Sequence, residues 1–523
     1  MCGIAAQYGS PDPAAGERAL ERLVHRGPDD AGSVCLEHAW LGHRRLSIVD
    51  VAGGHQPLVG ADPDRFFVGN GEIYNHAEIA AALHESARQG APDGPRPLPL
   101  HTHSDNEIAL RLFEAEGPEA LARLNGMYAF VIADRGGGFL AARDPVGIKP
   151  LYWVREGERV LFASEMAAFE TEHRAAIETF PPGHYWTPED GLVEFATAVP
   201  PDAREKPPAP TGEPGAPGEP PKRLYDDVRE TLIDAVERQM MGDVPVGVFL
   251  SGGLDSTLVA AIAQRYMRER GGCLQTFAVG LAGSPDLLAA RTAAAYLGTD
   301  HHERVYTAAE ATGSVADVVA AIEAYDPSLV RSAVPNHMLA EFTVEHVKVV
   351  LTGEGADELF AGYEYMREYD DAESLHAELV RGIEGLHNLN LQRCDRVTMA
   401  HGLEARVPFL DRAVIDLALR IPAEWKLTAE GEPEKRVLRQ AFDGWLPDEL
   451  LWRDKSQFGD GSGATDAIAE IVADTVTPEE FLAAQDEVDP ELRSREELAY
   501  YRMFQEHLGE VRPEHTLGRS ATA

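Results

Sequence analysis

The stretch VGVFLSGGLDSTLVA, from Val246 to Ala260, decides the fold of the second half of the chain. It begins with an apolar run, Val246–Leu250, passes through a Ser-Gly-Gly turn and continues into a helical pattern, Thr257–Arg268. Further apolar runs at Leu274–Val279 and Lys348–Leu351 predict more strands, and the second of these also ends in a glycine-rich turn. Strands that alternate with helices predict an α/β domain with a parallel sheet.

Ligands of parallel sheets bind at the carboxyl ends of the strands, where both glycine turns lie. The backbone amides of such a turn, at the start of a helix, suit a pyrophosphate group. The turn is not a Walker A loop, because it lacks the sequence GK[ST], and it is not a GxGxxG motif. Taken alone, a glycine turn that binds nothing remains an open alternative.

The first half of the chain has a different pattern. Short runs rich in β-branched and aromatic residues predict strands at Ala39–Leu46, Arg65–Val68, Ala129–Ala133, Phe139–Arg143 and Val160–Ala163. Two helical patterns, Ala15–Val24 and Asn106–Glu116, interrupt these runs. We therefore expect an α+β domain with stacked sheets.

A segment dominated by Pro, Gly and charged residues, Pro200–Arg223, separates the two halves. Such a composition cannot form a core, so it predicts an extended linker. The expected organisation is a first domain over residues 1–195, a linker over 196–223, a second domain over 224–513 and a frayed tail over 514–523.

The charge of the chain excludes some partners. A formal net charge of -40 opposes non-specific binding to nucleic acids or anionic membranes. The chain has only 7 lysines against 40 arginines. An acidic, lysine-poor surface suits solubility in high salt, and a GC-rich genome explains the same composition equally well. Because lysine is rare in this chain, a lysine inside a motif is less often an incidental surface charge.

Other features of the sequence indicate a cytoplasmic protein. No apolar stretch reaches the length of about 18 residues that a transmembrane helix needs, and the first residues lack the pattern of a signal peptide. The four cysteines form no CxxC pair, which argues against a disulfide framework or a zinc site.

Cys2 directly follows the initiator methionine, whose removal would leave a cysteine with a free α-amine that can act as base for its own thiol. A chance cysteine is the alternative. Four further motifs follow in order: HRGPDD (His25–Asp30), GHRRLSIVD (Gly42–Asp50), GNGEIYNH (Gly69–His76) and THSDNE (Thr102–Glu107). Together they resemble the class II glutamine amidotransferase domain, whose nucleophile is an amino-terminal cysteine.

The resemblance implies roles that fit the chemistry of glutamine. Arg45 grips the α-carboxylate, and Glu72 and Asp105 neutralise the α-ammonium group. Asn70 and the N–H of Gly71 form an oxyanion hole. The implied glutamine site comprises Arg45, Leu46, Ser47, Ile48, Val49, Asn70, Gly71, Glu72 and Asp105. An Asn-Gly hairpin turn and a surface arginine are the alternatives for single residues.

The motif SGGxDS resembles the pyrophosphate loop of N-type ATP pyrophosphatases. Downstream motifs resemble the synthetase domain of asparagine synthetase: LTGEGADELFAGY (Leu351–Tyr363), NLQRCDRVTMAHGLEARVPFLDR (Asn390–Arg412), EPEKRVLR (Glu432–Arg439) and WRDKSQFGDG (Trp452–Gly461). The resemblance extends almost end to end, to about residue 465.

The resemblance places ATP and pyrophosphate on Leu250, Ser251, Gly252, Gly253, Asp255, Ser256, Val279, Thr352 and Gly353. Asp255 and Asp357 supply oxygen ligands for Mg²⁺. Lys435 stabilises charge as pyrophosphate leaves, and Glu354 accepts a proton as ammonia attacks. The alternatives are a lysine paired on a helix surface and acidic residues of a helix start.

These resemblances imply an enzyme that makes asparagine from aspartate and ATP with glutamine as nitrogen donor. The family's ammonia tunnel would keep ammonia unprotonated between the two sites, and the family resemblance also suggests a homodimer. An amidotransferase for another carboxylate is the nearest alternative. β-Lactam synthetase lacks the terminal cysteine, and amidotransferases that share only the first domain lack SGGLDS. A non-enzymatic relative would have lost Cys2, Asp255 or Lys435.

The sequence departs from the family pattern at three places. Arg88–Pro99 predicts a loop insertion before the Asp105 motif, and Thr352 stands where serine is common. The proline-rich linker is unusually long.

Overall fold

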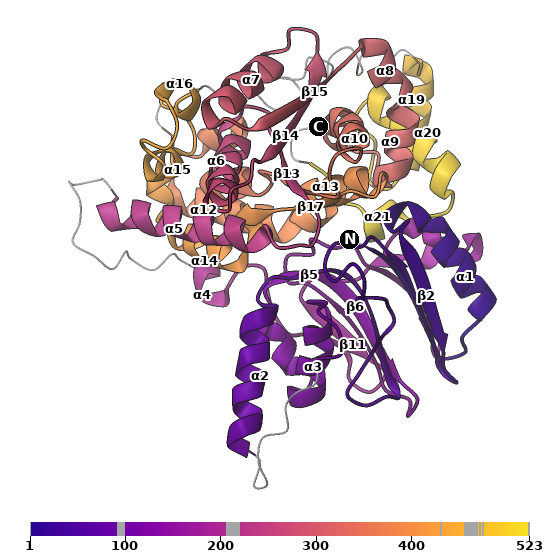
Figure 1. Cartoon of the computed structure of the whole chain (residues 1–523). Helices are drawn as coiled ribbons and strands as arrows, with labels where there is room; N and C mark the ends of the chain where they lie inside the picture. Colours follow the sequence, from indigo (N-terminus) through magenta and orange to yellow (C-terminus); the bar gives the residue numbers. More distant parts are fainter. Residues whose placement is uncertain are drawn as a thin grey trace.

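A computed structural model describes residues 2–90, 100–205, 220–428, 431–453, 469, 472 and 475–520. Figure 1 shows two parts, with the strand-rich first part below and the helix-rich second part above. Most of the predicted linker (206–219), most of the predicted insertion (91–99) and most of the motif that begins at Trp452 lie outside the described residues.

Two six-stranded sheets form the first part. The first sheet has the order β10-β8-β9-β1-β3-β2, with β1 (Cys2–Tyr8), β2 (Asp30–Cys35), β3 (Ala39–Arg45), β8 (Tyr152–Glu156), β9 (Arg159–Ala163) and β10 (Glu178–Thr179). The second has the order β12-β11-β7-β6-β5-β4, with β4 (Leu58–Val59), β5 (Arg65–Ile73), β6 (Gly126–Asp134), β7 (Phe139–Arg143), β11 (His184–Thr187) and β12 (Gly191–Glu194).

The two sheets pack face to face, because one core cluster contains Ile4 and Leu41 from the first sheet and Val68 and Val131 from the second. Helices cover the outer faces: α1 (Pro13–Arg22) lies on the first sheet, and α2 (His76–Gly90) and α3 (Glu107–Glu116) lie on the second. The predicted α+β domain with stacked sheets is confirmed as an αββα sandwich.

Helix α2 corrects the sequence analysis, which predicted only two helices here and a loop from Arg88. Ile79 and Leu83 are spaced four residues apart and bury their side chains against the second sheet. This spacing is the helical signal.

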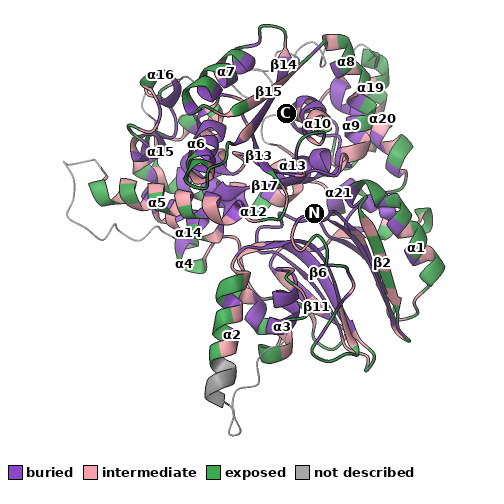
Figure 2. Cartoon of the chain, in the orientation of Figure 1, coloured by how far each residue is buried: buried purple, intermediate pink, exposed green. Residues whose placement is uncertain are grey.

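The second part contains a five-stranded sheet of order β15-β14-β13-β16-β17, in which every pair is parallel. Its strands are β13 (Val246–Phe249), β14 (Gln275–Leu281), β15 (Asp300–Tyr306), β16 (Val349–Leu351) and β17 (Glu404–Arg406). The predicted parallel α/β domain is therefore confirmed. Figure 2 shows its central strands and the inner helix faces as buried.

Helices surround this sheet. They are α5 (Lys222–Gln239), α6 (Leu254–Glu269), α7 (Pro285–Leu297), α8 (Ala308–Gly313), α9 (Val315–Ile322), α10 (Pro327–Thr343), α11 (Ala356–Phe360), α12 (Ala372–Gly385), α13 (Asn390–Met399), α14 (Arg412–Arg420), α15 (Arg436–Ala441), α16 (Asp448–Leu451), α19 (Pro478–Ala484), α20 (Arg495–Leu508) and α21 (Pro513–Thr516). None of the described helices is long and apolar enough to cross a membrane.

The described ends of the predicted linker and tail pack against other elements of the chain. Helix α4 (Pro201–Glu205) lies inside the predicted linker, and the carbonyl of Ala203 contacts His376 Nε2 at 2.7 Å. The predicted frayed tail is wrong for its described residues, because α21 buries Pro513 and Thr516. Ser520 also donates to Asp326, the residue that caps α10.

Buried ion pairs join the two parts. Arg26 is fully buried, and its Nη1 lies 2.8 Å from both Glu165 and Asp395. Asp395 belongs to α13 of the second part and also contacts Lys149 at 3.4 Å. Arg396 meets Glu165 at 3.0 Å. Charges removed from water in this way are stable only while each keeps its partner.

Replacement of Arg26 by methionine should lower the free energy of unfolding by about 3–5 kcal/mol, because Asp395 and Glu165 lose a buried cation. Urea denaturation of the full chain measures the effect. Arg18→Met is the matched control, since Arg18 pairs with Glu170 at the surface and its loss should change stability far less than the loss of Arg26. Equal effects of the two substitutions would contradict this role of the interface.

Candidate active sites

Cys2 is the first residue of β1 and is buried beside β5. Its backbone N–H donates to Asn70 Oδ1 at 2.9 Å, which sets the orientation of the Asn70 amide. The buried Nδ2 of Asn70 then has no hydrogen-bond partner among the described residues. An unpaired amide donor beside a thiol is suited to hold an oxyanion.

Gly71 follows Asn70 in β5 with a φ of 135°. A Cβ at this position would lie 1.9 Å from the carbonyl oxygen of Met127, so no other residue fits without a backbone shift. The backbone conformation and the close approach of Met127 therefore require glycine at position 71, independently of the oxyanion role expected for its N–H.

Burial raises the pKa of the Cys2 thiol, and the nearby Glu72 and Glu404 carboxylates raise it further. A hydrogen bond from the backbone of Leu46 acts in the opposite direction. Only the thiolate is a strong nucleophile, so this cysteine requires a base to remove its proton.

Glu72 and Asp105 form a buried acidic pair near Cys2. Burial raises the pKa of both, and the charge of Asp105 raises that of Glu72 further. Asp105 Oδ2 also accepts from the N–H of Ile73 at 2.5 Å. A ligand with an ammonium group would lower both pKa values and pair with the resulting carboxylates.

Arg45 lies directly opposite Cys2 in the pairing of β1 with β3. Its guanidinium group donates to the carbonyl oxygens of Val49, Asp50 and Val51, at 3.2, 2.7 and 3.2 Å. The group therefore supports the loop after β3, and binding of a carboxylate would require it to exchange some of these bonds.

The loop that contains Leu46, Ser47 and Ile48 is held by the second part of the chain. The carbonyl of Ile48 accepts from Asp243 N at 2.9 Å, and Asp50 N donates to Asp243 Oδ2 at 2.7 Å. Ser47 N donates to Asp29, whose carboxylate pairs with Lys348 at 2.7 Å. The sequence analysis did not foresee these contacts between the two parts.

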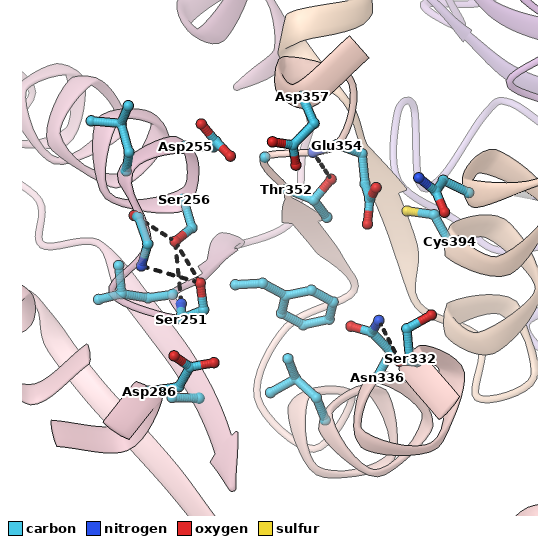
Figure 3. Close-up of a pocket in the computed structure, with 18 of the residues that line it drawn as sticks. Ser251, Asp255, Ser256, Asp286, Ser332, Asn336, Thr352, Glu354, Asp357 and Cys394 are labelled. Atoms are coloured by element: carbon cyan, nitrogen blue, oxygen red, sulfur yellow. Dashed lines mark hydrogen bonds between the residues drawn. The ribbon is translucent and has the colours of Figure 1, made fainter. Parts of the chain in front are cut away.

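The second site is a cavity of about 250 Å³ at the carboxyl ends of β13, β14 and β16. Its lining includes Leu250, Ser251, Gly253, Asp255, Ser256, Val279, Asn336, Thr352, Gly353, Glu354, Asp357, Tyr363, Asn390, Arg393, Cys394, Lys435 and Arg453. Figure 3 shows the acidic residues Asp255, Asp357 and Glu354 on one side of the cavity and Ser332 and Asn336 on another.

The Ser-Gly-Gly turn lies between β13 and α6. Gly252 has a φ of 73°, and a Cβ there would lie 2.5 Å from Ala289, so the turn requires glycine. The hydroxyls of Ser251 and Ser256 lie 3.1 Å apart, and Ser251 Oγ accepts from Gly253 N at 3.3 Å. The turn thus presents hydroxyls and the start of a 16-residue helix, which favour a phosphate.

Lys435 connects this turn to the loop after β16. Its buried Nζ lies 2.5 Å from Asp255 Oδ2 and 2.7 Å from Asp357 Oδ1, and the two carboxylates raise its pKa against the effect of burial. Lys435 adopts a left-handed φ of 56° immediately before α15. Such backbone strain is typical of functional sites.

Asp255 and Asp357 fit a magnesium ion by their chemistry. Mg²⁺ binds through one or two carboxylates together with phosphate oxygens and water. The two carboxylates converge on one cation, the Lys435 ammonium group. The described residues contain no group of three or more His, Cys, Asp or Glu side chains arranged for a metal ion, so phosphate oxygens would have to complete the coordination.

Glu354 forms an ion pair with Arg393 of α13 at the far side of the cavity. Burial raises the pKa of Glu354, and Arg393 opposes that shift. Cys394 follows Arg393 and lines the cavity, and Asp395 reaches Arg26, whose Nε donates to the carbonyl of Cys2 at 3.0 Å. Direct contacts therefore run from the cavity wall to Cys2.

Glu358 gives the second part a pH-dependent stability. Burial and the neighbouring Asp357 raise the pKa of Glu358 to about 7, and Tyr363 and Asn390 donate to its Oε1. The folded state therefore favours the protonated carboxyl. This stabilisation is complete below the ordinary pKa of about 4.5 and is lost as the pH rises through 7.

Glu358→Gln should remove this dependence, because the amide stays neutral. We expect the variant to be more stable than the wild type by less than about 1 kcal/mol at pH 5 and by up to about 3 kcal/mol at pH 8. Urea titrations at both pH values measure the difference. A difference that is the same at pH 5 and pH 8 would contradict the prediction.

The structure brings the sequence-predicted residues together in two groups, one around Cys2 and one around Lys435. Three residues near these groups were missed. Arg393 lies inside a quoted motif but its partner was not evident, and Asn336 lies outside every motif. Arg406 of β17 approaches Glu72 to 3.9 Å from the other part of the chain, which no local pattern signals.

Comparisons with known proteins agree with this division. The model of the asparagine synthase family matches residues 227–374 and 367–521, and that of the glutamine amidotransferase domain matches residues 1–189. The chain is 40% identical to "Asparagine synthetase [glutamine-hydrolyzing] 3" of Arabidopsis thaliana, over 88% of this chain and 79% of that protein.

Two further relatives extend this similarity. The chain is 38% identical to "Asparagine synthetase [glutamine-hydrolyzing]" of Zea mays, over 97% of this chain and 86% of that protein. It is 37% identical to "Asparagine synthetase B [glutamine-hydrolyzing]" of Escherichia coli (strain K12), over 89% of this chain and 83% of that protein. The similarity therefore spans both parts of the chain.

Proposed function

Because the chain belongs to the asparagine synthase family, we infer that it synthesises L-asparagine from L-aspartate and ATP with L-glutamine as nitrogen donor. The observation that supports this most strongly is the presence of both sites in one chain. A buried cysteine lies beside an unpaired amide donor, and a cavity with a phosphate-type turn lies across the interface. Amidation of a different carboxylate is not favoured by the relatives.

In the first half-reaction, Cys2 Sγ attacks the side-chain amide carbon of glutamine. Asn70 Nδ2 and the N–H of Gly71 hold the oxyanion, and the proton from the thiol passes to the leaving nitrogen. The C–N bond breaks to release ammonia, and water then hydrolyses the thioester to glutamate. Glu72 and Asp105 hold the α-ammonium group, and Arg45 binds the α-carboxylate.

In the second half-reaction, the side-chain carboxylate of aspartate attacks the α-phosphorus of ATP and pyrophosphate leaves. Residues 251–256 hold the leaving phosphates, and Lys435 stabilises their charge. Ammonia then attacks the β-carbonyl carbon of the aspartyl adenylate, and AMP leaves. Glu354, whose raised pKa suits a base, accepts the extra proton.

Magnesium is part of this proposal. Asp255 and Asp357 would hold the ion, which would neutralise charge on the pyrophosphate group. Removal of divalent cations with a chelator should abolish aspartate-dependent pyrophosphate release and leave glutaminase activity intact, because the first half-reaction uses no phosphate.

Ammonia must cross between the sites in its neutral form. Direct contacts link Cys2 through Arg26 and Asp395 to Cys394 of the cavity lining, so the two sites meet the same interface between the two parts. We place the ammonia passage there. The homodimer and the cytoplasmic location expected from the sequence remain proposals, and light scattering of the purified protein tests the first.

The decisive assay supplies ATP, Mg²⁺, glutamine and aspartate to the purified full chain. Asparagine, pyrophosphate and AMP should appear in equal amounts, together with glutamate. Release of glutamate without asparagine or AMP would overturn the proposal and leave only a glutaminase.

A further inference from the structure

Helix α10 forms one wall of the ATP cavity with residues that no motif assigned. Ser328, Ser332 and Asn336 all line the cavity and are spaced four residues apart, so they follow one face of the helix. Asp326 caps this helix through the N–H groups of Ser328 and Leu329, and Pro327 occupies its first position. The wall is therefore firmly positioned.

The side-chain amide of Asn336 has a defined orientation. Its Nδ2 donates to the carbonyl oxygen of Ser332 at 3.0 Å, so Oδ1 is the atom that faces the cavity. Figure 3 shows this arrangement. Oδ1 accepts no hydrogen bond from any residue that the structure describes.

Ser332 also presents a hydrogen-bond acceptor to the cavity. Its hydroxyl donates to the carbonyl oxygens of Ser328 and Leu329, at 2.9 and 3.0 Å, so its hydrogen is used within the helix. Only lone pairs of the oxygen remain for a ligand. Ser332 and Asn336 thus present hydrogen-bond acceptors to the cavity, and they favour a ligand with a hydrogen-bond donor at this place.

The strand β14 supplies a complementary edge in the same cavity. Phe277 accepts from Leu250 N at 2.8 Å, which directs the polar groups of Phe277 toward β13. In a parallel strand the backbone N–H and C=O of every second residue point to the same neighbouring strand, so those of Val279 point to the side of β13, as those of Phe277 do. β13 ends at Phe249, which pairs with Phe277, so no residue of β13 lies opposite Val279. The N–H and C=O of Val279 are therefore available to a ligand.

The surrounding surface is apolar. Phe277, Ala278 and Leu339 line the cavity together with Val279 and Asn336. A flat heteroaromatic ring fits such a surface, with its polar edge toward the backbone of Val279. Adenine offers this shape, and its 6-amino group carries two hydrogens. One can meet the Val279 carbonyl, which leaves the second for another acceptor.

We propose that Asn336 Oδ1 accepts a hydrogen bond from the 6-amino group of adenine and thereby determines the preference of this enzyme for ATP over 6-oxopurine nucleotides. The proposal rests on the function inferred above. A 6-oxopurine places a carbonyl oxygen opposite Oδ1, so two acceptors face each other without a proton between them. Sites built on a hydrogen bond reject such analogues strongly.

The test compares ATP, inosine triphosphate and purine riboside triphosphate, which has hydrogen at position 6. Aspartate-dependent pyrophosphate release is measured with ammonium chloride as nitrogen source, so the glutamine site is not needed. The wild type should prefer ATP over inosine triphosphate by at least about 100-fold in kcat/KM. In Asn336→Leu, kcat/KM for ATP should fall about tenfold, as expected for one hydrogen bond.

The diagnostic quantity is the ratio between nucleotides. For Asn336→Leu, kcat/KM with inosine triphosphate should rise, because the acceptor that opposes its 6-oxo group is removed, and kcat/KM with purine riboside triphosphate should stay within about twofold of the wild type. The preference for ATP over inosine triphosphate should therefore shrink by at least about tenfold. Glu341→Gln is the control, because Glu341 lies on the same helix, is exposed and does not line the cavity. It should leave all ratios unchanged.

Two outcomes would overturn the proposal. An equal fall with all three nucleotides would mean that Asn336 only maintains the wall, and a rise in KM for aspartate with unchanged nucleotide ratios would place the amino acid at this wall. Failure of the wild type to make any asparagine would instead refute the proposed function. Calorimetric binding of ATP and inosine triphosphate to wild type and Asn336→Leu would then decide the role of Asn336 alone.

Discussion

Replacement of Cys2 by alanine should abolish synthesis from glutamine and spare synthesis from ammonia. Glutaminase activity should fall by more than about 1,000-fold, because alanine lacks the nucleophile for the first half-reaction. Asparagine formation from ammonium chloride should stay within about twofold of the wild type. The nitrogen of residue 2 can still donate to Asn70 Oδ1 in the alanine variant, so the fold around the site is preserved.

Cys35→Ala is the matched control, since Cys35 is an exposed cysteine of the same domain and should affect neither activity. Assays of glutamate release and of asparagine formation with each nitrogen source give the comparison. Survival of glutamine-dependent synthesis in Cys2→Ala would refute the nucleophile assignment. Active protein that retains Met1 would refute the role of the free α-amine.

Replacement of Lys435 by methionine should impair the ATP-dependent half-reaction and spare the hydrolysis of glutamine. Aspartate-dependent pyrophosphate release should fall by about 100- to 1,000-fold, as when one preorganised donor to a developing negative charge is removed. The substitution keeps the length of the side chain but leaves Asp255 and Asp357 without the cation between them. Glutaminase activity without ATP should remain near the wild-type value.

The chain offers a close control for this variant. Lys426 is also buried, burial lowers its pKa to about 7, and its Nζ donates to the carbonyl of Ala418 at 2.6 Å, outside the cavity lining. Lys426→Met should alter stability without a change in kcat for pyrophosphate release. A comparable loss of pyrophosphate release in both variants would show that any buried lysine has this effect, and the proposed role of Lys435 would fall.

Several elements could be predicted because their signals are local. The strand Phe139–Arg143 was predicted with the bounds that β7 has, and the runs that became β13 and β14 were placed within two residues. Short runs bounded by Gly, Pro or Asp have this property, since turn residues mark their ends. Helix α2 was missed because only a few large apolar residues mark its buried face, and the alanine and polar residues between them weaken the helical periodicity.

The candidate sites divide in the same way. The motifs identify Cys2, Asn70, Asp255 and Lys435 without reference to their distances, and their roles stay predictions. The pairing of Glu354 with Arg393 and the approach of Arg406 to Glu72 depend on how distant segments pack. No periodicity or composition encodes the direction in which a side chain points across an interface.

The amino-acid sequence alone determined the two fold classes, the order of the chemical motifs and the family resemblance, because hydrophobic periodicity and turn residues act over a few neighbours. Only the tertiary structure decided that the Asn70 amide turns its Oδ1 to Cys2, that buried ions join the two parts, and that Asn336 faces the nucleotide cavity. The first two arrangements arise from contacts between segments tens to hundreds of residues apart, and the third combines a bond to Ser332 within α10 with the packing of that helix against β14. In each case packing and the pairing of buried polar groups select one orientation among many.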